Sequence, residues 1–91
     1  MDDCTHTNEI DLLFWKIAQL DDEDAFRSLF FKFFSSLCVF AHRYIEQWET
    51  CEDIVQDTFF KIWKNRKKMI INTSGRNLLL TSVRNSCVDY L

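Results

Sequence analysis

Residues 22–47 have the sequence DEDAFRSLFFKFFSSLCVFAHRYIEQ, and this stretch decides the fold class. Apolar side chains recur along it every three or four residues, which is the spacing of a buried helical stripe. The stripe consists of Phe26, Leu29, Phe30, Phe33, Leu37, Phe40, Ala41 and Tyr44. Phe34, Cys38 and Ile45 widen it to about half of the helix circumference. The pattern predicts a central helix from Asp22 to Gln47 that other elements cover.

Three further helices are predicted around the central one. They cover residues 8–20, 50–68 and 74–91. Thr50 is the expected N-cap of the third helix, and Ser74 or Thr73 that of the fourth. Within the last helix the expected inward side chains are Leu79, Leu80, Val83, Cys87 and Leu91. A chain of 91 residues with one glycine and no proline suits one domain without turn-rich strands. We therefore expect an all-α fold, a compact bundle of about four helices with no sheet.

Charge is distributed unevenly along the chain. The formal net charge is −3, yet residues 1–24 carry eight acids and one base, and residues 61–91 carry seven bases and one acid. Aspartates at 21–24 lie where they can cap the central helix and interact favourably with its dipole. An acidic total excludes a uniformly basic surface. It does not exclude nucleic-acid binding by the basic end, because screening confines electrostatic effects to about 8 Å.

The cysteines predict neither a metal site nor a disulfide framework. They stand at positions 4, 38, 51 and 87, without the close pairs of zinc or redox motifs. Cys38 and Cys87 fall on apolar faces, so we expect reduced, structural thiols. The N-terminus lacks a basic start followed by an apolar run, and no apolar stretch reaches the roughly 20 residues of a membrane span. We expect a cytoplasmic protein.

No set of catalytic residues can be identified. The only candidate pair is Cys38 and His42, one helical turn apart, and apolar packing explains the thiol without chemistry. We expect His42 to bond a backbone carbonyl rather than act as a ligand or base. The prediction is a protein that is not an enzyme, with no cofactor, no metal and no small-molecule substrate.

The outer face of the third predicted helix is unusual. Its members are Asp53, Gln56, Asp57, Phe60 and Lys64, which place a large aromatic ring among acidic and amide groups. Two interpretations remain open from spacing alone. Phe60 either packs under the first helix or serves as the aromatic anchor of a partner-docking face.

The fourth predicted helix carries a polar stripe on its outer side. Its members are Asn77, Thr81, Arg84, Asn85 and Val88. Asn and Arg can hydrogen-bond base edges, and Thr and Val can contact a thymine methyl group. An ordinary solvated helix face is the alternative interpretation.

Two motifs resemble region 2 of the sigma-70 family. Residues 51–63, CEDIVQDTFFKIW, are similar to the core of the helix that docks on RNA polymerase, and residues 82–91, SVRNSCVDYL, to the helix that recognises promoter DNA. The similarity extends over about residues 20–91. Small size and the lack of insertions resemble the extracytoplasmic function (ECF) subgroup.

The resemblance implies two binding faces. Asp53, Gln56, Asp57, Phe60 and Lys64 would bind the clamp helices of the β′ subunit of core polymerase. The loop before the fourth helix and that helix's outer face would hold the non-template single strand of the promoter −10 element. The DNA-binding residues implied are Lys67, Lys68, Ile71, Asn72, Thr73, Ser74, Arg76, Asn77, Thr81, Arg84 and Val88. Many relatives have an aromatic residue in place of Leu78 and a larger residue in place of Gly75.

The resemblance also suggests a domain organisation. Residues 1–20 form an acidic segment with a first helix, and residues 21–91 form the region 2-like domain. The chain is expected to be a fragment whose second, helix-turn-helix domain is absent. The implied function is transcription initiation by a sigma factor domain, with an anti-sigma factor as a possible further partner. The alternative is a helical protein–protein interaction module without DNA binding.

Overall fold

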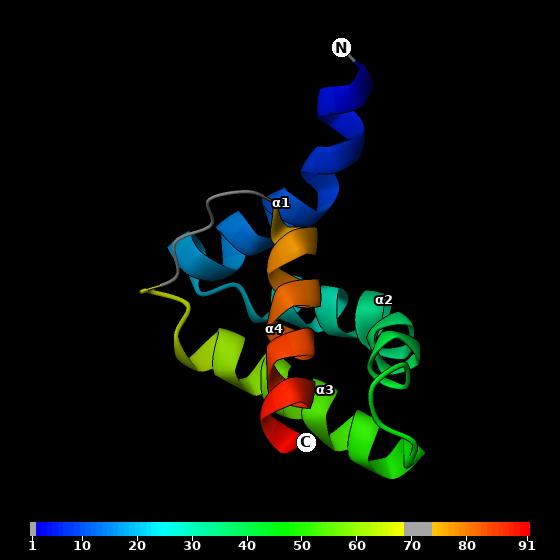
Figure 1. The fold of residues 1–91 in the computed structure, drawn as a ribbon. Coiled ribbons are helices and arrows are strands. Elements are labelled where there is room, and N and C mark those ends of the chain that lie inside the picture. The colour runs from blue at the N-terminus through cyan, green and yellow to red at the C-terminus, as the bar shows by residue number, and fades with distance from the viewer. Residues whose placement is uncertain (1, 69–73) are drawn as a thin grey trace.

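The computed structural model describes residues 2–68 and 74–91, with side chains from Glu9 onward. It contains four helices, α1 (Asp2–Leu20), α2 (Glu23–Ala41), α3 (Trp48–Lys64) and α4 (Gly75–Tyr90), and no strand within those residues (Figure 1). The all-α prediction of about four helices is confirmed.

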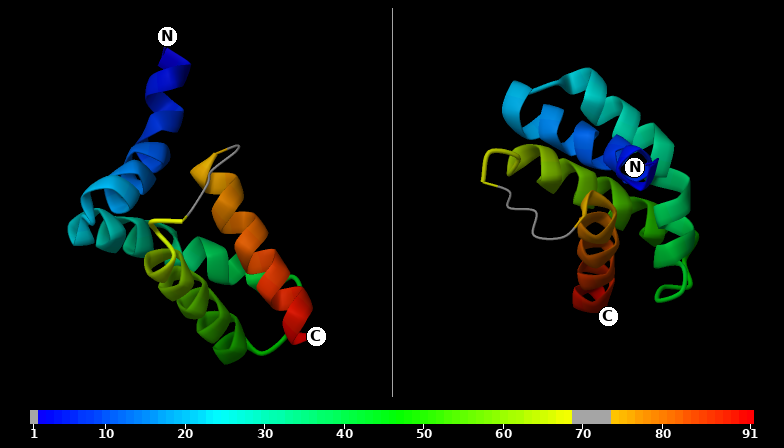
Figure 2. Two further views of the ribbon diagram at one scale, coloured as in Figure 1. Left: turned by 90° about the vertical axis from the view of Figure 1, so that its left-hand side faces the viewer. Right: turned by 90° about the horizontal axis from the view of Figure 1, so that it is seen from above.

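Helix α2 is the centre of the packing. It contacts α1, α3 and α4, and its buried residues are Ala25, Leu29, Leu37, Cys38 and Ala41. Helices α1, α2 and α3 run side by side, whereas α4 crosses them, and the first part of α1 projects beyond the other three (Figure 2). The core is completed by Phe14 and Ile17 of α1, Val55 and Phe59 of α3, and Leu79 and Val83 of α4.

The central helix is shorter than predicted. It ends at Ala41 and not at Gln47. The chain turns after Ala41 so that Ile45, 2% exposed, can enter the core. Two side chains contact the carbonyl oxygen of Ile45: the His42 ring at 3.1 Å and the Cys51 thiol at 3.3 Å. Tyr44 was predicted inside the apolar stripe, but it lies in this turn and is exposed.

The other helix ends test the capping predictions. Ser74 caps α4, since its hydroxyl oxygen accepts a hydrogen bond from the backbone N–H of Asn77 at 3.2 Å. Thr50 is not the cap of α3, because α3 begins at Trp48 with Gln47 as its N-cap. Helix α3 also ends at Lys64, four residues earlier than predicted.

Helix α1 begins at Asp2 and not near residue 8. Most of the predicted inward side chains of α4 do face the core. Leu91 is the exception, because it follows the last helical residue and is 77% exposed.

Gly75 allows α4 to start directly against α1. Its backbone N–H donates a hydrogen bond to Asp11 Oδ1 at 2.8 Å. A Cβ atom at this position would lie 2.7 Å from Cε2 of Phe14 and 3.0 Å from Cγ2 of Ile10. Phe14 is fully buried and cannot swing away. The absence of a side chain at residue 75 is therefore required by the packing of these two helices.

The connection between α1 and α2 is tied to the end of α3. Asp21 has a left-handed backbone conformation with φ of 52°, which aspartate tolerates better than most residues. Its Oδ1 accepts a hydrogen bond from Arg66 Nε at 2.8 Å and lies 3.0 Å from Lys67 Nζ. Hydrogen bonds from Arg66 and then Lys67 hold the pKa of the Asp21 carboxyl group below its ordinary value of 3.8.

We expect Gly75→Ala to lower the free energy of unfolding by about 1–3 kcal/mol, because the methyl group overpacks the contact with Phe14. A gain in helix propensity of at most about 1 kcal/mol offsets part of this loss. Urea denaturation measures the difference. Asn77→Ala, exposed in the same first turn, should stay within about 0.5 kcal/mol of the wild type. Wild-type stability of Gly75→Ala would contradict the packing argument.

We expect Asp21→Asn to lower the melting temperature at pH 7, because asparagine keeps the left-handed backbone and loses both ion pairs. The lowered pKa in the folded state means that the charged carboxylate stabilises the fold above pH 3.8. This stabilisation disappears as pH falls below 3.8 and through the folded-state pKa. Thermal unfolding should therefore give a difference between the two proteins that shrinks on acidification. A difference independent of pH would contradict an electrostatic role.

Candidate functional site

Five exposed side chains form a line on the outer side of α3, here named the α3 row. They are Asp53, Gln56, Asp57, Phe60 and Lys64. On the opposite side of the helix Val55, Phe59 and Ile62 are buried. Thr58 is also buried, and its hydroxyl donates to the carbonyl oxygen of Ile54 at 2.8 Å. The inner side therefore anchors the helix, and the α3 row is presented on a rigid support.

Phe60 is the apolar member of the α3 row and is 60% exposed. Helix α1 packs against α2 and α4 and leaves this ring uncovered. The interpretation that Phe60 packs under the first helix is wrong. An exposed ring beside charged groups can serve as the aromatic anchor of a protein-binding surface.

An acidic hollow lies where α4 crosses α3. This open cavity of about 600 Å3 includes Asp53 and Asp57 of the α3 row together with Asp89 and Tyr90 of α4. Lys61 Nζ forms an ion pair with Asp57 at 3.0 Å. The four-residue spacing of Asp57 and Lys61 could have indicated this pair. The position of Asp89 and Tyr90 beside α3 was not predicted, since only the crossing of the helices brings them to this place.

A second set of exposed side chains follows the outer side of α4, here named the α4 row. Its members are Arg76, Asn77, Thr81, Arg84 and Val88. Arg84 Nη1 donates to Oδ1 of the neighbouring Asn85 at 3.2 Å. Guanidinium, amide, hydroxyl and methyl groups thus share one accessible surface. This surface can offer both hydrogen bonds and apolar contacts to nucleotides.

The approach to α4 contains the rest of the predicted DNA-binding residues. Ser74 is half-buried and uses its hydroxyl to cap α4. Ile71, Asn72 and Thr73 lie outside the described residues. Leu78 is partly buried and packs against the core, so it offers no flat exposed surface beside Ser74.

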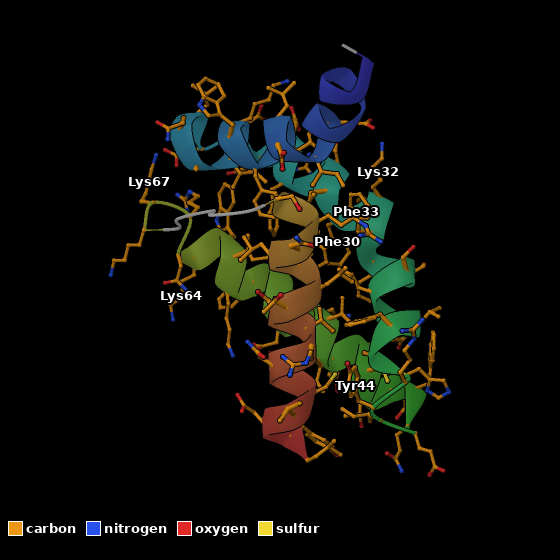
Figure 3. The ribbon with its side chains drawn as sticks, turned by 45° about the horizontal axis from the view of Figure 1, so that its top comes forward. Phe30, Lys32, Phe33, Tyr44, Lys64 and Lys67 are labelled. Atoms are coloured by element: carbon orange, nitrogen blue, oxygen red, sulfur yellow. The ribbon has the colours of Figure 1, made fainter. Side chains whose placement is uncertain are left out.

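The basic residues at the end of α3 lie to one side of α4, as Lys64 and Lys67 show in Figure 3. Lys67 Nζ contacts Asp21 at 3.0 Å and the carbonyl oxygen of Ala18 at 3.0 Å. The structure thus joins Lys67 to the connection between α1 and α2 and not to the α4 row. Lys64 and Lys68 are exposed and have no ion pair with another described side chain.

Three of the four thiols and His42 can be compared with the predictions, since the Cys4 side chain lies outside the described residues. Cys38, Cys51 and Cys87 are free and buried. Burial raises the pKa of the Cys38 thiol to about 11 and raises the pKa values of Cys51 and Cys87, which keeps all three protonated at neutral pH. The expected bond of His42 to a backbone carbonyl is present, with Ile45 as its partner.

Neither a metal-binding cluster nor a membrane-spanning helix is found among the described residues. Among the side chains of residues 9–68 and 74–91, no cluster of three His, Cys, Asp or Glu residues has the geometry to hold a metal ion. None of the four helices combines the length and the apolar character needed to cross a membrane.

The comparison with protein families identifies the domain. A family model described as sigma-70 region 2 matches residues 29–91, which include most of α2 and all of α3 and α4. Searches of curated proteins and of solved structures gave no match. Region 2 is the part of a sigma factor involved in RNA polymerase binding and promoter −10 recognition, and it is not a catalytic domain. The chain therefore belongs to the sigma-70 family and carries its region 2 domain.

Proposed function

We propose that this chain is the region 2 domain of an ECF sigma factor that acts in the cytoplasm and directs core RNA polymerase to its promoters. The domain performs no chemistry. It contributes specificity by joining two surfaces, the α3 row for the polymerase and the α4 row for DNA.

The α3 row is the proposed contact for the clamp helices of the β′ subunit. The observation that carries this proposal is the 60% exposure of the Phe60 ring next to the exposed Gln56 and Asp57 side chains. An aromatic side chain that becomes desolvated at the centre of an interface can contribute 2 kcal/mol or more, as is typical of hot spots. Asp53 and Asp57 orient a basic partner and raise its association rate.

The α4 row is the proposed contact for the non-template strand of the −10 element. Asn77 and Arg84 can hydrogen-bond base edges, and Thr81 and Val88 can contact a thymine methyl group. Exposed Arg76 and Lys68 can bind phosphates in a salt-dependent manner. Lys67 can bind a phosphate only if its ion pair with Asp21 is broken.

The segment before α4 is proposed to hold an unstacked base. Ile71, Asn72, Thr73 and Ser74 are assigned to this pocket on the basis of the family resemblance. Base stacking on an aromatic side chain contributes about 1–3 kcal/mol, and the half-buried Leu78 cannot supply it. We therefore expect weak binding of DNA by the isolated domain and stronger binding in the presence of core polymerase.

We expect Phe60→Ala and Asp57→Lys each to weaken binding to core polymerase at least tenfold, because they remove the aromatic anchor or reverse a charge beside it. Affinity measurements with purified core test this expectation, and circular dichroism checks that the helices are retained. Glu49→Lys makes the same charge change at an exposed site of α3 outside the α3 row and should bind like the wild type. Unchanged affinity of both test variants would refute the docking assignment.

We expect Arg84→Ala to weaken binding of a single-stranded −10 oligonucleotide by about 1–3 kcal/mol when core polymerase is present, because a base or phosphate contact is lost. Fluorescence anisotropy of the labelled strand measures the change. Arg43→Ala removes an exposed arginine in the turn after α2, outside the α4 row, and is the matched control. Equal affinities of Arg84→Ala and the wild type would remove α4 from the DNA interface.

A further inference from the structure

An aromatic strip crosses from α2 to α3 next to the α3 row. The ring of Phe26 lies 5.1 Å from that of Trp63, and the ring of Phe30 lies 5.0 Å from that of Phe59. Phe31 continues the strip outward, with its ring 5.5 Å from that of Phe30. Side chains from two helices thus form one connected aromatic surface.

Two hollows adjoin along this strip. One, of about 260 Å3, is lined by Gln56 and Phe60 of the α3 row. The other, of about 510 Å3, is lined by Phe31 and Glu23 of α2. Phe26, Phe30 and Trp63 line both of them. The surface that carries Phe60 is therefore continuous with a second apolar surface on α2.

The contact of Phe31 with Phe30 leaves most of the Phe31 side chain uncovered. Its side chain is 74% exposed, although it stands beside the aromatic core of the domain. A single exposed apolar side chain needs no explanation, but two exposed rings at the edges of adjoining hollows form a patch. Patches of this kind mark contacts with other proteins.

The charges at the two ends of the strip indicate the chemistry of the partner. Glu23 lies at one end, and Asp53 lies one turn before Gln56 at the other end. Neither has an ion pair with another described side chain, whereas the nearby Arg27 is paired with Asp24 at 2.8 Å. Residues 53–63 of α3 span about 15 Å, or about three helical turns. A partner helix with apolar side chains in its middle and basic residues at its ends is complementary to this surface.

We propose that the polymerase segment that contacts the α3 row also covers α2 as far as Phe31, and that Phe31 and Glu23 are binding residues. This inference rests on the proposed function, because it assigns both rings to the same partner helix. The two hollows share Phe26, Phe30 and Trp63 as lining residues. A helix placed on Phe60 therefore also lies over part of the hollow beside Phe31, which supports a single binding partner for both. Phe31 then supplies a second aromatic anchor, and Glu23 binds a basic side chain at the end of the partner helix.

The test compares Phe31→Ser with Val39→Ser in the full chain. Both side chains are exposed on α2, but Val39, 61% exposed, lines neither hollow. Affinity for purified core polymerase should fall at least fivefold for Phe31→Ser and stay within twofold of the wild type for Val39→Ser. Circular dichroism should give wild-type helix content for both variants.

The charge contribution is tested with Glu23→Lys against Glu46→Lys. Both glutamates are exposed, and only Glu23 lines a hollow. Glu23→Lys should weaken core binding at low salt, and the difference should shrink as salt is raised. Wild-type affinity of Glu23→Lys at low salt would overturn the assignment of this residue.

The outcomes separate the inference from the proposed function. If the wild-type chain does not bind core polymerase, both fail. If the wild type binds, Phe60→Ala binds weakly and Phe31→Ser binds normally, only the inference fails. Sedimentation of the free chain provides a further check. A dimer that Phe31→Ser abolishes without changing core affinity would make a second copy the occupant and overturn the inference.

Discussion

The aromatic contact between α2 and α3 is the interaction on which the rest of the structure depends. Phe59 packs against Phe26 and Phe30, with ring centroids 6.2 Å and 5.0 Å apart. This contact sets the rotation of α3 about its own axis. A rotation by one residue, about 100°, would bury Phe60 in place of Phe59 and turn the acidic side chains inward. Thr58 tolerates burial because Ile54 accepts its hydroxyl hydrogen bond. The exposed α3 row is thus a direct consequence of core packing.

Some of the acids near the N-terminus form ion pairs with bases later in the chain. Asp21 binds Arg66 and Lys67, and Glu9 binds Lys32 at 2.6 Å. Arg66 also lies over the Trp63 ring, 4.0 Å from its centroid. It therefore stabilises the end of α3 both through the ion pair with Asp21 and through this contact. These contacts remove part of the basic end from the groups that are available to phosphate. The bases that remain accessible lie on the α4 row and at Lys64 and Lys68.

Local features of the sequence were enough to predict much of this structure. The spacing of apolar residues identified the four helices, because periodicity depends on residues a few positions apart. Ser74, one of the two caps predicted for the last helix, is its N-cap. The same spacing placed the five members of the α3 row on one side of their helix, and Asn77, Thr81, Arg84 and Val88 of the α4 row on one side of theirs. The predicted end of α2 was wrong because a tertiary contact intervened: α2 stops early so that Ile45 can reach the core. The predicted start of α3 was also wrong, since α3 begins at Trp48, before Thr50.

The sequence by itself determined the helix content, the side chains that share a helix face and the family motifs, since each of these depends on residues within one helical segment. Only the tertiary structure decided which segments meet. It brought Gly75 against Phe14, joined Asp21 to the end of α3, and extended the surface around Phe60 as far as Phe31. These contacts link residues up to 64 positions apart, as in the bond between Asp11 and Gly75. No local propensity specifies such pairs, because they arise from the way in which the apolar faces of separate helices share one core.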